Sequence, residues 1–154
     1  MLRGRVTHSV IRLLDCITNS GSAEKDLAAH HRTGRRGEED AYFYLRRHGY
    51  VMVARNFRTA RHHGEVDLIG WDQDVLCFIE VKTRTTRDVK TAQASVDRDK
   101  RRALRRVVRD YLHSFPERQF PQAPQWRFDV VTVYYEKEAP RPVFELFRNA
   151  ALSS

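Results

Sequence analysis

Residues 64–83 read GEVDLIGWDQDVLCFIEVKT and contain two candidate strands joined by a short polar turn. The first candidate covers residues 65–71 and the second covers residues 75–83. Residues 72–74 between them predict a hairpin turn, although no glycine supports it. Residues 75–79 are apolar on both faces, which is typical of a strand that is covered on both sides. This stretch therefore predicts the centre of a sheet.

Helical and strand patterns flank this central pair of strands. A helix is expected over residues 38–47, followed by a strand over residues 51–58. A long helix with a continuous apolar stripe is expected over residues 96–115, and two further strands over residues 128–135 and 143–147. The order is thus helix, three strands, helix, two strands. It predicts the α/β class, with a mixed β-sheet flanked by helices.

One domain over residues 33–150 is expected, because a chain of 154 residues suits a single hydrophobic core. Residues 1–32 are polar and loosely patterned, which predicts a tail that is partly disordered or forms a short helix. Arg12 and Asp15 interrupt the one apolar patch of this tail and argue against a signal peptide. Residues 151–154 are expected to form a second short tail.

The net charge is +8 and the isoelectric point is near 9.9, which favours an anionic partner. Nucleic acid is the commonest such partner, but a membrane surface also attracts basic proteins, so charge alone leaves both open. No apolar stretch approaches the length of a membrane span, and no membrane partner is expected. Cys16 and Cys77 cannot form a disulfide framework, which favours a reducing compartment and a cytoplasmic location.

Charged residues at the end of the central strand pair predict a metal site. The alternation of a strand places Glu80 and Lys82 on one face. If Gln73 and Asp74 are the two loop residues of the hairpin, Asp67 lies opposite Glu80. Two facing carboxylates repel each other, and a buried carboxylate is costly unless it is paired or bound to a metal. Since hard oxygen ligands suit Mg²⁺ and Mn²⁺, we expect Asp67 and Glu80 to hold one of these cations.

Lys82 is expected to take part in the chemistry at this metal site. A bound cation can polarise a phosphate and lower the pKa of a bound water, and Lys82 could stabilise the charge that develops on the phosphate or orient that water. The same hairpin register places Glu65 opposite Lys82. The alternative is a structural cluster of salt bridges, because Glu-x-Lys alone is common by chance.

Glu38 is the fourth candidate catalytic residue, from the helix expected over residues 38–47. The helical period puts Ala41, Tyr42 and Leu45 on one side and projects Glu38 onto the middle of that apolar stripe. Glu38 is therefore expected to face the sheet, and its neighbour Glu39 to face water.

A basic surface is expected on the long helix, on the side opposite its apolar stripe. The ordinary interpretation of such a face is simple solvation, but few acids offset this run of positive charge. A face of nearly one sign favours contacts with phosphates. The residues expected to contact nucleic acid, with DNA favoured over RNA, are Arg35, Arg36, Arg58, Arg84, Arg101 and Arg105.

Several short stretches together form a recognisable pattern: residues 34–41, 44–45, 49–50, 55–56, 64–69 and 78–84, Lys100, residues 127–131 and residues 148–150. With these stretches the chain resembles the UPF0102 (YraN-like) family of predicted endonucleases, which are distantly similar to archaeal Holliday junction resolvases. The tail before Thr33 and the loop over residues 85–92 depart from the family pattern. The resemblance implies a restriction-endonuclease-like fold, in which Asp67 and Glu80 bind the metal, Lys82 is the catalytic lysine and Glu38 is the acid from the helix.

The sequence thus favours a Mg²⁺- or Mn²⁺-dependent endonuclease that hydrolyses phosphodiester bonds in DNA, with branched or damaged DNA among the candidate substrates. Resolution of a junction would need two sites, which makes a homodimer a candidate assembly. The first alternative is a non-catalytic nucleic-acid-binding protein of the same fold. The second is a basic adaptor that binds an acidic protein through the long helix.

Overall fold

The computed structural model describes residues 31–85, 98–116 and 122–150 of the chain. Contacts within the chain divide it into two units, Met1–Arg35 and Arg36–Ser154. Of the first unit the structure describes residues 31–35, which are helical. The tails expected over residues 1–32 and 151–154 lie almost entirely outside the described residues, so the division into a domain and two tails stays a prediction.

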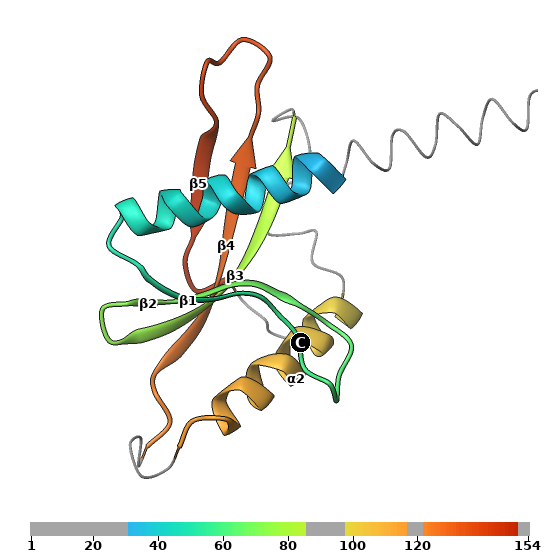
Figure 1. Cartoon of the computed structure of the whole chain (residues 1–154), viewed down its shortest axis with the longest axis vertical. Coiled ribbons are helices and arrows are strands. Elements are labelled where there is room, and N and C mark those ends of the chain that lie inside the picture. Colours follow the sequence, from blue (N-terminus) through green and yellow to red (C-terminus); the bar gives the residue numbers. More distant parts are fainter. Residues whose placement is uncertain (1–30, 86–97, 117–121, 151–154) are drawn as a thin grey trace, which may run out of the picture. The chain divides into compact units, whose positions relative to one another are not determined.

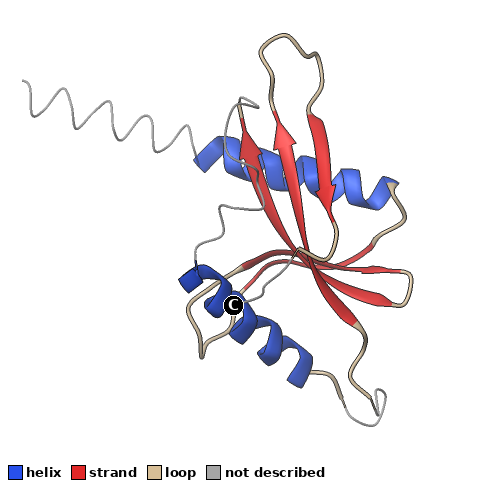
Figure 2. Ribbon diagram, turned by 180° about the vertical axis from the view of Figure 1, so that it is seen from behind, coloured by secondary structure: helices blue, strands red, loops and turns tan. Residues whose placement is uncertain are grey.

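The second unit contains a five-stranded sheet in the order β1-β2-β3-β4-β5. Figure 2 shows its strands in red. Its strands are β1 (Val51–Phe57), β2 (Val66–Asp72), β3 (Val75–Arg84), β4 (Trp126–Tyr134) and β5 (Val143–Phe147). Strands β3 and β4 pair in parallel, and the other neighbouring strands pair antiparallel. The predicted α/β class and mixed sheet are confirmed, and β3 is the central strand, as its apolar character on both faces indicated.

Each face of the sheet packs against a helix. The helix α2 (Arg98–His113) follows β3 in sequence and precedes β4, because parallel strands need a crossover connection (Figure 1). Leu104 and Val107 of α2 pack in one core cluster with Phe78 and Val130 of the sheet. The opposite face forms the second cluster with the first helix, whose described part covers residues 31–47.

The first helix lies close to β3 at Gly37. A Cβ atom at this position would overlap the side chain of Thr83, so only glycine allows this approach. Gly37, Ala41 and Leu45 are buried in succession and define the inward side of the helix. The prediction that Glu38 occupies the middle of this stripe is therefore wrong by one position: Gly37 lies there, and Glu38 is partly buried at its flank. Glu39 is exposed, as expected.

The turn between β2 and β3 has the predicted loop of two residues. Asp72 pairs with Val75, which leaves Gln73 and Asp74 as the loop. Gln73 takes the left-handed conformation, with a φ of 54°, in a turn that lacks glycine. The remaining pairs run from Trp71 with Leu76 to Leu68 with Ile79, so the turn fixes which face each later side chain occupies.

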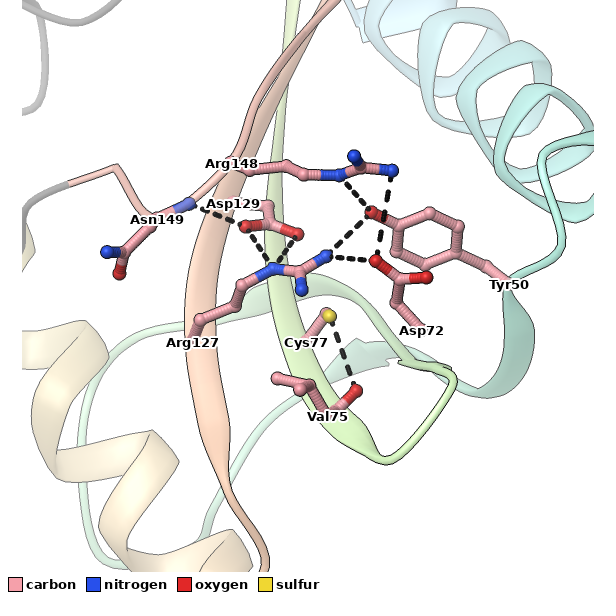
Figure 3. Close-up of polar contacts among 8 residues, drawn as sticks. All are labelled: Tyr50, Asp72, Val75, Cys77, Arg127, Asp129, Arg148 and Asn149. Carbon is pink, nitrogen blue, oxygen red and sulfur yellow. Dashed lines mark hydrogen bonds and ion pairs between the residues drawn. The ribbon is translucent and has the colours of Figure 1, made fainter.

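A hydrogen-bond network around Arg127 lies where β2 ends and β4 begins (Figure 3). The Nε atom of Arg127 donates to both carboxylate oxygens of Asp129, at 2.9 and 3.0 Å, and Asp129 is fully buried. Its Nη2 atom donates to Asp72 at 2.6 Å and to the Tyr50 hydroxyl at 2.9 Å. Charge-assisted hydrogen bonds of this kind are about twice as strong as neutral ones. Arg127 therefore ties the start of β4 to the end of β2 and to the segment that follows the first helix.

The chain after β5 joins the same network. The backbone N–H of Asn149 donates to Asp129 at 2.9 Å, and the backbone N–H of Ala150 donates to the Phe128 carbonyl at 2.8 Å. Arg148 donates to the Tyr50 hydroxyl at 3.4 Å. Three of the stretches that carry the family resemblance, residues 49–50, 127–131 and 148–150, thus meet in a cluster that stabilises the fold.

Candidate functional site

Asp67 and Glu80 lie side by side where β2 and β3 stop pairing. The ladder between the two strands ends at Leu68 and Ile79, and the same register continued by one residue sets Asp67 opposite Glu80. The Oδ2 atom of Asp67 accepts a hydrogen bond of 2.7 Å from the backbone N–H of Val81. A side-chain carboxylate therefore satisfies the backbone of β3 at the point where the neighbouring backbone no longer does.

The carboxylate of Glu80 is buried, with 2% of the residue exposed, and its two oxygens differ. Oε1 accepts a hydrogen bond of 2.8 Å from Lys82 Nζ and another from Lys100 Nζ. Oε2 is buried and has no hydrogen-bond partner among the described residues. An unsatisfied buried polar atom destabilises a fold, and one on a charged group costs more than a neutral one. Oε2 is thus a buried acceptor that could take a further ligand.

The same buried environment changes the pKa of the Asp67 carboxyl. Burial raises the pKa of the Asp67 carboxyl to about 7, and the negative charge of Glu80 adds to the increase. The hydrogen bond from Val81 works in the opposite direction, but does not offset these effects. Near neutral pH, a large fraction of the Asp67 carboxyl groups is therefore protonated.

Glu38 reaches the edge of this site from the first helix. Its Oε2 atom accepts a hydrogen bond of 2.9 Å from Asn56 of β1, and its charge contributes to the raised pKa of Asp67. The structure thus brings Glu38 near the predicted pair. Glu65 behaves differently from the expectation: it lies before the start of β2 and forms an ion pair with Arg58, so its predicted cross-strand pairing with Lys82 is absent from the ladder.

Lys100 is the site residue that the sequence reasoning missed. Its charge alone assigns it to the solvent side of the long helix, and the structure turns its ammonium towards Glu80 instead. Burial lowers the pKa of Lys100, but its hydrogen bond to Glu80 and the charge of that carboxylate raise the pKa by more, so the ammonium stays charged. The helical spacing of the sequence does predict this orientation. Leu104 and Val107 lie four and seven residues after Lys100 and are buried, which places all three on one side of a helix.

The arginines expected to contact nucleic acid come from several elements of the structure. Arg36 makes an ion pair of 3.8 Å with Asp40 and stacks over the Tyr135 ring at 5.0 Å. The side chains of Arg36 and Arg58 are 70% and 71% exposed, so both remain accessible to a large ligand. Arg105 is exposed on α2, and Arg84 and Arg101 are partly buried. Arg35 belongs to the first unit and is exposed there.

The site offers a pair of carboxylates as ligands. In the described part of the chain, no group of three or more His, Cys, Asp or Glu side chains is placed to hold a metal ion. Two carboxylates are nevertheless what a Mg²⁺ site commonly takes from the protein, because waters and substrate phosphates supply the remaining ligands. The Glu80 oxygen that lacks a partner among the described residues and the neighbouring Asp67 carboxyl therefore fit such a cation. Within residues 31–85, 98–116 and 122–150, no helix is both long and apolar enough to span a membrane.

Comparison with known proteins places these residues in a family. The model of the uncharacterised protein family UPF0102 matches residues 37–133. The chain belongs to this family. A UPF0102 protein of Koribacter versatilis is 53% identical over 148 residues, covering 96% of each chain. A UPF0102 protein of Solibacter usitatus is 41% identical over 117 residues, covering 76% of this chain and 83% of the relative. The UPF0102 match spans every residue of the site: Glu38, Asp67, Glu80, Lys82 and Lys100.

Proposed function

We propose that this chain is a Mg²⁺- or Mn²⁺-dependent endonuclease of restriction-endonuclease-like fold that hydrolyses phosphodiester bonds in DNA. The observation that carries the proposal is the state of Glu80, a carboxylate with 2% exposure whose Oε2 atom has no hydrogen-bond partner among the described residues. Asp67 lies beside it with its pKa raised to about 7 by burial and by the charge of Glu80. Two carboxylates forced together in this way favour a divalent cation.

The arrangement of the strands supports the fold assignment within the proposal. The acid of β2 and the Glu-x-Lys of β3 meet where their ladder ends, and β3 then pairs in parallel with β4 across a helical crossover. These are the positions at which the family resemblance implies a metal-binding Asp and a Glu-x-Lys motif. Function is still argued from the site, because one fold hosts many activities.

Four residues of the site have roles in the proposed reaction. Asp67 and Glu80 would hold the cation, which when bound would polarise the scissile phosphate and lower the pKa of a bound water. Lys82 Nζ lies 2.8 Å from Glu80 Oε1 on a side chain that is 16% exposed, so the ammonium is held at the site and can stabilise charge on a phosphate oxygen. Glu38, fixed by Asn56, would add negative potential that favours cation binding.

Positive charge on the surface would bring the DNA to this site. The chain has a net charge of +8, and α2 presents Arg102, Arg105 and Arg109 as exposed residues. Contacts of arginine with phosphates supply affinity without reading sequence, which suits an enzyme that recognises backbone shape. A four-way junction would need two such sites, and hence two copies of the chain.

A non-catalytic nucleic-acid-binding protein is the second candidate, and one observation favours it. Lys82 and Lys100 both donate to Glu80, so the charge of this carboxylate is already balanced without any cation. In that case the acids and lysines would be a structural cluster, and binding would depend on the arginines alone.

Cleavage assays separate these two functions. Single-stranded, double-stranded and four-way-junction DNA would be incubated with the full chain in Mg²⁺ or Mn²⁺. We expect cleavage of at least one substrate, a loss of about 100-fold or more in the variants Glu80→Gln and Lys82→Met, and full activity in the control Glu138→Gln, which changes an exposed acid between β4 and β5. Equal trace activity in wild type and variants would leave only the binding function.

A further inference from the structure

Lys100 joins the site from a different element than the other charged residues. It lies in the first turn of α2, which begins at Arg98. Leu104 and Val107, one and two turns further along, are buried in the core that α2 forms with the sheet. The side chain of Lys100 is therefore directed towards β3, where its ammonium donates to Glu80 Oε1. A helix residue thus neutralises a carboxylate that the sheet buries.

The two lysines at Glu80 are not equivalent. Lys82 lies two residues away on the same strand, and its side chain is 16% exposed. Lys100 reaches the same oxygen from the helix, and its side chain is 45% exposed. Lys82 is consequently held in place by β3, whereas Lys100 has room to turn towards solvent. If one of the two ammonium groups leaves Glu80, it is Lys100.

Electrostatic repulsion by a bound cation would favour the departure of the Lys100 ammonium from Glu80. A carboxylate that already contacts two ammonium groups attracts a third positive charge less strongly, and like charges at contact distance repel each other in a partly buried site. The oxygen that lacks a partner within the described residues, Glu80 Oε2, belongs to the same carboxylate as the oxygen that Lys100 occupies. Binding of a divalent cation at Oε2 and binding of Lys100 at Oε1 therefore compete.

We infer that Lys100 is the built-in counter-ion of Glu80, which balances the charge of this carboxylate in the cation-free protein and is released towards the phosphates of the nucleic acid when the cation binds at Oε2. This inference rests on the proposed function, because it takes Glu80 as a metal ligand. Lys100 is then a positioning residue of the cation-free protein. Arg102, Arg105 and Arg109 are exposed on the opposite side of the same helix, so a released Lys100 would present its charge at the carboxylate site and not within that basic surface.

Competition predicts that removal of Lys100 tightens cation binding. Mn²⁺ alone would be titrated calorimetrically into the full chain as wild type, Lys100→Met, Glu80→Gln and Lys137→Met. Lys137 is an exposed lysine in the turn between β4 and β5, so its variant controls for the loss of one positive charge. We expect Lys100→Met to bind Mn²⁺ about tenfold more tightly than wild type, Lys137→Met to bind like wild type, and Glu80→Gln to lose binding.

The possible outcomes separate the inference from the proposed function. Mn²⁺ binding that requires Glu80 but is unchanged or weaker in Lys100→Met overturns the counter-ion role and leaves the metal site intact. A merely structural role for Lys100 predicts this weaker binding, because loss of a structural contact does not improve a ligand site. Absence of Mn²⁺ binding in both wild type and Lys100→Met overturns the metal site and the inference together.

Amine labelling of the wild-type chain provides a test that does not depend on the folding of a variant. Acetylation of each lysine would be followed by mass spectrometry with and without Mn²⁺. The inference predicts that Mn²⁺ increases the labelling rate of Lys100 several-fold and leaves that of Lys137 unchanged. Labelling of Lys100 that Mn²⁺ leaves unchanged or slows would contradict its release.

Discussion

The carboxylate of Asp67 accepts the backbone N–H of Val81 at 2.7 Å, and Val81 is the residue that follows Glu80. This one bond holds the acid of β2 against the acid of β3 after the ladder between the strands has ended at Leu68 and Ile79. The two acids are thus kept together by the architecture of the sheet in spite of their repulsion. Several measurable properties depend on that relationship.

Replacement of Asp67 by asparagine is expected to stabilise the protein above neutral pH. The pKa of Asp67 rises from 3.8 to about 7 on folding, so the folded state binds the proton more tightly and stability falls as the pH increases through this range. The amide of the variant stays neutral, and its oxygen can still accept the Val81 N–H. In urea unfolding with a chelator present, the advantage of Asp67→Asn over wild type should grow by about 1–3 kcal/mol between pH 5 and pH 8. A difference that does not depend on pH would refute the raised pKa.

If Asp67 and Glu80 hold a divalent cation as proposed, the cation should stabilise the wild-type fold, because it binds the folded site and not the unfolded chain. At a free Mn²⁺ concentration about 100 times the dissociation constant, the stabilisation is about 2.7 kcal/mol. The resulting increase in Tm should be larger at pH 8 than at pH 6, since protonation of Asp67 opposes cation binding at the lower pH. Scanning fluorimetry of wild type, Glu80→Gln and the control Glu138→Gln would measure it. An equal increase in all three proteins would locate the cation elsewhere.

Loss of Arg127 is expected to destabilise the fold without involving the site. Arg127→Met would remove the main ion-pair partner of Asp129, whose side chain is fully buried. Breaking a buried ion pair by removing one partner costs about 3–5 kcal/mol, while replacing both partners by apolar residues costs far less. Chemical unfolding should therefore show a large loss for Arg127→Met and a partial recovery for the double variant Arg127→Met, Asp129→Leu. A loss below about 1 kcal/mol in the single variant would mean that this network contributes little.

If the chain binds DNA as proposed, replacement of arginines of α2 should weaken the binding. Each phosphate contact that is lost should reduce the slope of log affinity against log salt concentration by about one. Arg105→Gln should therefore bind more weakly and with a shallower salt dependence than wild type. Arg141→Gln, which changes an exposed arginine in the turn before β5, should bind like wild type. Fluorescence anisotropy across a range of salt concentrations would detect equal slopes for both variants if α2 does not contact the DNA.

Local sequence patterns are sufficient to predict much of the fold. The residues Gln73 and Asp74 predict the length of the hairpin loop, and that length fixes the faces of Asp67 and Glu80 because side chains alternate along a strand. The apolar run before Glu80 predicts the central strand. These features depend on neighbours a few residues apart, which a single sequence displays directly.

Contacts between distant elements are harder to predict. Arg127 bonds to Tyr50 and Asp72, which lie 77 and 55 positions away in sequence, and no periodicity links them. The predicted position of Glu38 on its helix is off by one residue, because Gly37 occupies the inward position and a glycine does not count among the apolar residues that define such a stripe. The charge of Lys100 favours the solvent side, although its helical spacing to the buried Leu104 places it towards the sheet.

Anomalous scattering from crystals grown in Mn²⁺ would show whether Glu80 and Asp67 hold a divalent cation. We expect an anomalous peak within bonding distance of Glu80 Oε2 and an Asp67 carboxylate oxygen, and we expect it to be lost in crystals of Glu80→Gln. Well-ordered wild-type crystals that show both carboxylates but no anomalous peak between them would rule out this cation site.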